Sequence, residues 1–126
     1  MRKTIILIIV LVATFSISSY AQTLKITAVD ASDPKVYEKL SQGLGKTITL
    51  SFYDNSITLN TQGEKPLNLK KVSDSKYYKS VTTGTTVETY SLTVNKVFGV
   101  VSSIELNFTG KKRDVSNWAT LTAKRL

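Results

Sequence analysis

The chain of 126 residues contains no cysteine and no histidine. Without them it cannot build a Ser-His-Asp or Cys-His catalytic set, a thiol redox centre, or a zinc site of nitrogen and sulfur ligands. It also lacks a phosphate-binding glycine loop, a dinucleotide-binding glycine pattern and a calcium loop. We therefore expect a protein that is not an enzyme and that uses no cofactor and no metal. Packing and hydrogen bonds, without disulfides, must stabilise its fold.

One short motif bears on catalysis. Ser73-Asp74-Ser75-Lys76 matches the S-x-x-K pattern, in which a lysine helps to activate a serine nucleophile. Enzymes with this pattern place it on a helix and carry further S-D-N and K-T-G motifs, which this chain does not contain. Small polar residues between two apolar runs are typical of a turn. We interpret the motif as a turn and predict no catalytic residue.

The N-terminus has the layout of a secretory signal peptide. Two basic residues precede an unbroken apolar run over residues 5–13, and the polar stretch after it has small residues at Ser19 and Ala21. An apolar run of about ten residues is too short for a bilayer, which needs about twenty. We predict cleavage between Ala21 and Gln22 and export to the periplasm or the cell exterior.

The predicted organisation is a signal peptide over residues 1–21 and one β-rich domain over residues 22–126. No segment of the predicted mature chain is apolar enough to form a transmembrane helix. Without Arg2 and Lys3 the predicted mature chain has fifteen basic and nine acidic residues, a net charge of +6. A positive surface can attract acidic partners, but this value is ordinary for a soluble domain, which is the interpretation we favour. Nucleic-acid binding needs aromatic and basic side chains interleaved on one exposed face. Since the sequence does not show this pattern, we expect no nucleic-acid partner.

Apolar and polar residues alternate in short runs separated by turn residues, which predicts antiparallel strands. The segment TITLSFYDNSITLN is the clearest hairpin. A two-residue turn at Asp54-Asn55 places Phe52 opposite Ile57 and Leu50 opposite Leu59. An alternative turn at Asn55-Ser56 changes the register and keeps the same faces. All four apolar side chains then share one face of the hairpin.

Later strands repeat the alternation, with a bend at Phe98-Gly99 and a predicted loop over residues 109–116. The side chains predicted to face inward on these strands are Tyr90, Leu92, Val94, Ile104, Leu106, Phe108, Ala119, Leu121 and Ala123. About eight strands with short connections form an antiparallel up-and-down meander. This number suffices for a small all-β barrel or half-barrel.

One short helix is predicted after the first strand. Asp33 or Ser32 can cap it, Pro34 suits its first position, and glycines at positions 43 and 45 end it after about ten residues. Its apolar stripe consists of Val36, Tyr37, Leu40 and Leu44. A helix this short needs support from the sheet. It therefore either closes the barrel or packs across an open sheet, in an alternative α+β arrangement.

The apolar inner face suggests a ligand site. Aromatic side chains on a concave sheet can anchor a small hydrophobic or amphipathic ligand. The candidate ligand-binding residues are Leu50, Phe52, Tyr90, Leu92, Leu106 and Phe108. The alternative is a filled core, in which case the domain is a structural or protein-interaction module whose partner is an envelope or extracellular protein.

The segments YAQ, SFYDNSITLN, YSLTVNKV, SIELNF and ATLTAKR resemble small exported lipocalin-like proteins of Bacteroidetes. The resemblance covers residues 45–125 and rests on this pattern of segments. It implies a calycin-like barrel, complete or incomplete, and a small apolar ligand. The chain departs from true lipocalins because it is shorter and has no Gly-x-Trp near the predicted mature start, so no ligand residue is carried over.

Overall fold

The computed structural model describes residues 21–125. The predicted signal peptide, residues 1–21, lies outside the described residues except for Ala21, where the first strand begins. In chain order the elements are β1 (Ala21–Ala31), α2 (Pro34–Ser41), β2 (Thr47–Phe52), β3 (Ser56–Thr61), β4 (Leu67–Ser73), β5 (Lys76–Thr83), β6 (Thr86–Val97), β7 (Val100–Lys112) and β8 (Val115–Arg125).

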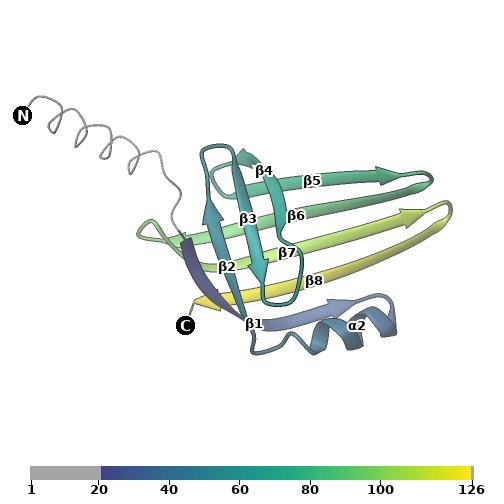
Figure 1. The fold of residues 1–126 in the computed structure, drawn as a ribbon, viewed down its shortest axis with the longest axis horizontal. Helices are drawn as coiled ribbons and strands as arrows, with labels where there is room; N and C mark the ends of the chain where they lie inside the picture. The colour runs from purple at the N-terminus through teal and green to yellow at the C-terminus, as the bar shows by residue number, and fades with distance from the viewer. Residues whose placement is uncertain (1–20, 126) are drawn as a thin grey trace, which may run out of the picture.

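Each strand pairs antiparallel with the next one, and β8 pairs with β1, so the strands form a closed barrel (Figure 1). This order confirms the predicted all-β meander with one helix after the first strand, and it excludes the open α+β sheet. The predicted hairpin register is also confirmed. Phe52 pairs with Ile57 and Leu50 pairs with Leu59.

Strand β1 contributes to two parts of the molecule. Its residues 21–25 pair with β2, and residues 24–31 pair with β8. The register against β8 shifts between Ile26 and Ala28, which marks a bulge at Thr27. A bulge bends a strand and increases its twist. Beyond this point β1 separates from β2 and continues along β8 alone.

The strands differ in length, and this difference shapes the fold. Strands β2, β3 and β4 have six or seven residues, whereas β6, β7 and β8 have eleven to thirteen. The long strands therefore continue past the barrel, together with β5 and the end of β1. We call this part the sheet extension. In Figure 1 it points to the right, and α2 lies below it beside β1.

The barrel interior is filled by side chains. Its buried residues are Leu24, Ile26, Ile48, Leu50, Phe52, Ile57, Leu59, Leu69, Tyr77, Leu92, Val94, Val101, Ile104 and Ala123. At the end that includes the β2–β3 turn, the rings of Phe52 and Tyr77 meet edge to face with centroids 6.5 Å apart. The Lys96 ammonium lies 5.6 Å from the centroid of Phe52. The protein's own side chains thus occupy the barrel interior.

Helix α2 has the predicted cap. The Asp33 carboxylate accepts a hydrogen bond from the Lys35 N–H at 2.9 Å, and Pro34 occupies the first turn. The helix has eight residues, fewer than the predicted ten, because it ends at Ser41, before Gly43. None of its residues is fully buried.

Two backbone hydrogen bonds join the chain that follows α2 to β1. The Ile26 N–H donates to the Lys46 carbonyl oxygen at 2.8 Å, and the Gly45 N–H donates to the Ile26 carbonyl oxygen at 2.9 Å. Gly45 has φ +83°, a conformation that glycine adopts without strain. These bonds hold α2 beside the sheet extension.

The predicted loop over residues 109–116 is wrong. Strands β7 and β8 pair continuously as far as Lys112 opposite Val115, with a tight turn at Arg113-Asp114. Glycine and clustered lysines are typical of loops. Here Gly110, Lys111 and Lys112 lie in β7. A strand can contain these lysines because the sheet extension is exposed to solvent.

Candidate functional site

An apolar hollow of about 200 Å³ lies between α2 and the inner face of the sheet extension. We call it the groove. Its lining residues are Val36, Leu40, Tyr90, Leu106, Phe108, Ala119, Thr120 and Leu121. Two of them come from the helix stripe and the others from β6, β7 and β8.

The groove exists because one wall of the barrel stops early. On β6 the inward residues Tyr90, Leu92 and Val94 succeed one another at every second position. Val94 and Leu92 are buried in the core cluster, which also includes residues of the short strands β2, β3 and β4, whereas Tyr90 is only partly buried. The same inner face therefore belongs to the core at one end and to the groove at the other.

Two aromatic rings form part of the groove floor. Tyr90 pairs with Phe108 across β6 and β7, and their ring centroids are 5.1 Å apart with an interplanar angle of 52°. Such tilted aromatic pairs contribute attraction beyond the burial of their area. The Tyr90 hydroxyl also donates a hydrogen bond to Oε2 of Glu88 at 3.3 Å.

The groove raises the pKa of Tyr90 above its usual value of 10.0. Partial burial, which disfavours the phenolate, is the largest cause. The negative charge of Glu88 and the hydrogen bond to its carboxylate act in the same direction. The Tyr90 hydroxyl is therefore a neutral hydrogen-bond donor at neutral pH.

The groove opens into a wider hollow at each end. Towards the β7–β8 turn, a hollow of about 570 Å³ shares Val36 and Phe108 with the groove and includes Glu88, Lys112 and Arg113. Towards the β3–β4 turn, a second hollow of about 540 Å³ is partly lined by Lys39, Lys46, Gln62 and Glu64. An apolar centre thus lies between two polar mouths in which basic groups outnumber acidic ones.

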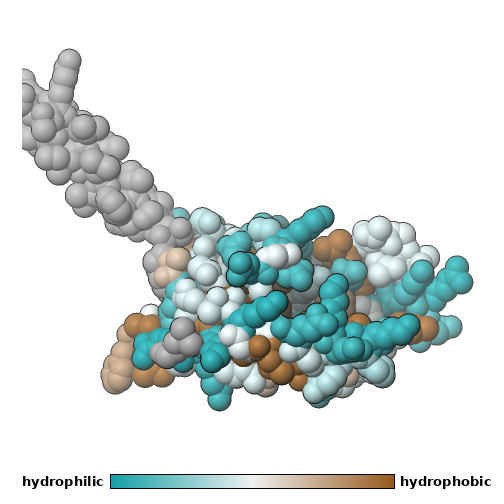
Figure 2. Space-filling view, turned by 60° about the horizontal axis from the view of Figure 1, so that its bottom comes forward, coloured by the Kyte–Doolittle hydropathy of each residue, from teal (hydrophilic) through white to brown (hydrophobic). Residues whose placement is uncertain are grey.

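Figure 2 views the molecule with the side that carries α2 turned forward. Hydrophilic side chains cover most of this side, and hydrophobic ones appear in small separate areas. A broad protein-binding surface usually exposes a larger continuous apolar patch. This side of the molecule shows no such patch (Figure 2).

The structure divides the six sequence-predicted ligand residues into two groups. Leu50, Phe52 and Leu92 lie in the packed core, where neighbouring side chains leave them little or no exposed surface. Tyr90, Leu106 and Phe108 line the groove. The structure adds Val36, Leu40, Ala119 and Leu121, and for these the signals were the helix stripe and the inward alternation of β8.

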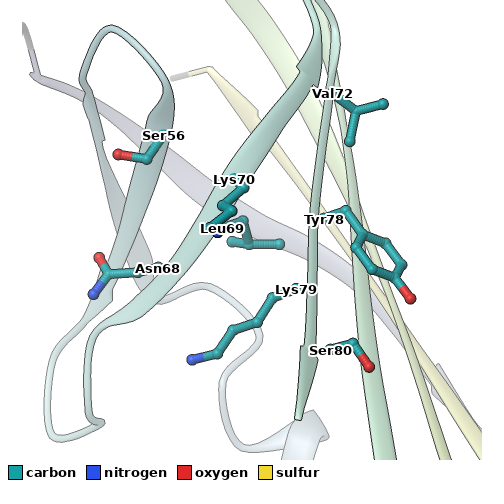
Figure 3. A pocket seen from close by; sticks show the side chains of 8 residues that line it. All are labelled: Ser56, Asn68, Leu69, Lys70, Val72, Tyr78, Lys79 and Ser80. Atoms are coloured by element: carbon teal, nitrogen blue, oxygen red, sulfur yellow. The ribbon is translucent and has the colours of Figure 1, made fainter.

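Another hollow, of about 710 Å³, lies where β4 and β5 separate (Figure 3). The two strands pair only near their turn, as far as Lys70 opposite Tyr78. Buried Leu69 lies in this gap, and the Lys79 side chain extends across it (Figure 3). Its lining has no carboxylate beside the lysines, so it offers no acid–base pair.

The Ser73-Lys76 motif lies at the β4–β5 turn, where the two residues pair across the hairpin. The nearby Asp74 carboxylate forms a salt bridge with the Lys71 ammonium at 3.4 Å. This location agrees with the turn interpretation. Among residues 21–125, no three acidic side chains come together to form a metal site.

No protein-family model, no curated protein and no solved structure matched the chain. Within the described part of the chain, no helix combines the length and hydropathy needed to span a bilayer.

Proposed function

We propose that the protein is an exported, non-enzymatic binding module of lipocalin-like type that holds one small hydrophobic or amphipathic ligand. The groove, and not the barrel interior, is its site. The single observation that carries this proposal is the incomplete burial of the inner face at Tyr90, Leu106 and Phe108. Because these side chains are in contact with water, covering them with an apolar ligand is favourable through the hydrophobic effect.

The filled barrel supports this placement. Leu50 and Leu92 are 0% exposed, so a ligand there would have to displace core side chains. In the groove, a ligand meets α2, whose residues are not fully buried. Hydrogen bonds of the segments on both sides anchor α2 to β1 and β8, and a helix without buried residues can shift outwards at lower cost than a packed strand.

Titration with N-phenylnaphthylamine tests the site, because this neutral probe becomes fluorescent in apolar surroundings. The test variant is Leu106→Ser, which removes apolar surface from the groove floor. The matched control is Val97→Ser, which removes an exposed aliphatic side chain at the β6–β7 turn. Circular dichroism verifies that both variants fold.

We expect saturable binding with one site, weakened about tenfold by Leu106→Ser because a leucine contact contributes about 1.4 kcal/mol or more. Val97→Ser should bind as the wild type does. Absence of saturable binding, or equal losses in the two variants, would overturn the proposal. Native mass spectrometry of protein purified from its own host then identifies the natural ligand by its mass.

Export is tested separately by the mass of the mature protein. Cleavage between Ala21 and Gln22 makes Gln22 the first residue of β1. The Gln22 side chain accepts a hydrogen bond from the Val101 N–H at 3.1 Å and also donates one to the Val101 carbonyl oxygen. A mature N-terminus beyond Gln22 would remove this anchor and contradict the predicted cleavage site.

A second candidate function is a protein-interaction module, and one observation favours it. The Phe98 side chain at the β6–β7 turn is fully exposed, and its neighbours Val97 and Val100 are also exposed. An apolar turn in solvent is a suitable contact for another protein. Co-purification of a stoichiometric protein partner that is lost in Phe98→Asn would support this alternative.

A further inference from the structure

Basic groups continue the groove along β7. Phe108, Gly110 and Lys112 occupy alternate positions and so share the inner face of this strand. Gly110 has no side chain, and the Phe108 ring lies over it, since a Cβ at this glycine would be 3.1 Å from Cζ of the ring. The apolar floor of the groove therefore extends to Gly110, the residue before Lys112 on this face of the strand.

The mouth at the β7–β8 turn has an excess of positive charge. Lys111, Lys112 and Arg113 line it, and Glu88 is its one acidic residue. Among residues 21–125 the only salt bridge joins Lys71 to Asp74, so the basic groups of this mouth have no anionic partner within that part of the chain. The Glu88 carboxylate accepts the hydrogen bond from the Tyr90 hydroxyl.

We infer that the ligand is an amphiphile with one apolar chain and an anionic head group, whose chain lies in the groove and whose head group binds Lys112 and Arg113. This inference rests on the proposed function and specifies the ligand class of the same site. From Leu106 to Lys112 the strand rises about 20 Å, at 3.3 Å per residue. An extended acyl chain fits along this length.

The opposite mouth is less suited to an anion. Lys39 and Lys46 line it together with Glu64, so its excess of positive charge is smaller. The β7–β8 mouth also includes Arg113, whereas the basic residues of the opposite mouth are lysines, and a guanidinium can bind a carboxylate or phosphate through two parallel hydrogen bonds. This comparison directs the head group to the β7–β8 turn.

Two dansyl probes test the head group. Dansyl-labelled undecanoic acid and its methyl ester share one fluorophore and one chain and differ in charge. The variant Lys112→Gln/Arg113→Asn removes both cations, and asparagine suits position 113, where φ is +55°. The control Lys39→Gln/Lys46→Gln removes two cations at the other mouth.

For the wild type and the control we expect the acid to bind about fivefold more tightly than the ester, as two partly exposed charge contacts allow. In Lys112→Gln/Arg113→Asn the two probes should bind alike, with the affinity for the ester unchanged. Added salt should weaken binding of the acid alone. Equal binding of both probes to the wild type would contradict an anionic head group. If only the control variant Lys39→Gln/Lys46→Gln lost the preference for the acid, the head group would not bind at Lys112 and Arg113.

The outcomes separate this inference from the proposed function. Failure of both dansyl probes and of N-phenylnaphthylamine to bind removes the function itself, whereas binding of all three without charge preference removes only the inference. Flotation with phosphatidylglycerol vesicles distinguishes a free amphiphile from a membrane lipid. Flotation of the protein with these vesicles, without binding of the free acid, would contradict a free ligand.

Discussion

The Phe108 ring lies over Gly110, two residues further along the same face of β7, so close that a Cβ on the glycine would be 3.1 Å from Cζ. Ordinary Cβ contacts are longer, so a side chain at position 110 must move the ring. Glycine inside a strand often marks such a close approach. Here it sets the position of an aromatic ring that lines the groove.

Gly110→Val tests this relationship. The valine side chain should push the Phe108 ring towards Leu106 and reduce the groove volume. We expect N-phenylnaphthylamine to bind about fivefold more weakly, since overpacking costs of about 1 kcal/mol are common. Thr109→Val, on the neighbouring outward position, is the control and should bind normally. Unchanged binding in a folded Gly110→Val protein would place the probe elsewhere.

Leu92 and Leu106 are a second test, because they pair across β6 and β7 but lie in different environments. Leu92 is 0% exposed in the core, whereas Leu106 is partly exposed in the groove. Leu92→Ala should lower the free energy of unfolding by about 3 kcal/mol, and Leu106→Ala by about half as much. Urea unfolding measures both values. The order should reverse for probe binding, where Leu106→Ala has the larger effect, and equal destabilisation would contradict a groove at Leu106.

The same pair explains what the sequence predicts well. Alternation with a period of two identifies inward side chains, and both leucines were predicted to face inward on this basis. The hairpin register of Phe52 opposite Ile57 followed from the two turn residues between the strands. Strand order also followed, since short connections join neighbouring antiparallel strands.

Alternation does not reveal where an opposing strand ends. Leu92 is buried in a core that includes residues of β2–β4, which are distant in sequence, whereas Leu106 is only partly buried against that core. The bulge at Thr27, which directs β1 away from β2, has no clear sequence signal. The loop predicted over residues 109–116 failed for a related reason. Lys111 and Lys112 predicted a solvent-exposed loop. They lie instead in a strand of the sheet extension, where their side chains are also exposed to solvent.

Tyr90 leads to a prediction about pH. Its pKa is raised in the folded protein, mainly by burial and then by Glu88. Because the unfolded chain releases this proton at about pH 10, the contribution of Tyr90 to stability is complete below that pH. It is lost as the pH rises from there through the folded pKa.

Urea unfolding at about pH 8 and at about pH 10.5 measures this loss, in the range where a tyrosine ionises. The wild type should lose more stability between the two conditions than Tyr90→Phe. Tyr53→Phe, which removes an exposed hydroxyl at the β2–β3 turn, is the control. Equal losses in the wild type and in Tyr90→Phe would show that burial of the Tyr90 hydroxyl does not affect alkaline stability.

The β6–β7 turn carries a cost in stability. Phe98 and Gly99 have φ values of +51° and +78°, and such turns favour Asn-Gly over a bulky first residue. The Phe98 ring is 101% exposed, so it contributes no burial in return. Phe98→Asn should raise the free energy of unfolding by about 1 kcal/mol, as measured by urea unfolding.

Phe98→Ser is the matched control, because it removes the same ring and tolerates positive φ less well than asparagine. Phe98→Asn should therefore be the more stable of the two, and probe binding in the groove should be unchanged in both. A fall in stability in both variants would mean that the ring supports the turn. The stabilised Phe98→Asn variant is also the reagent for testing the proposed protein-interaction function at this turn.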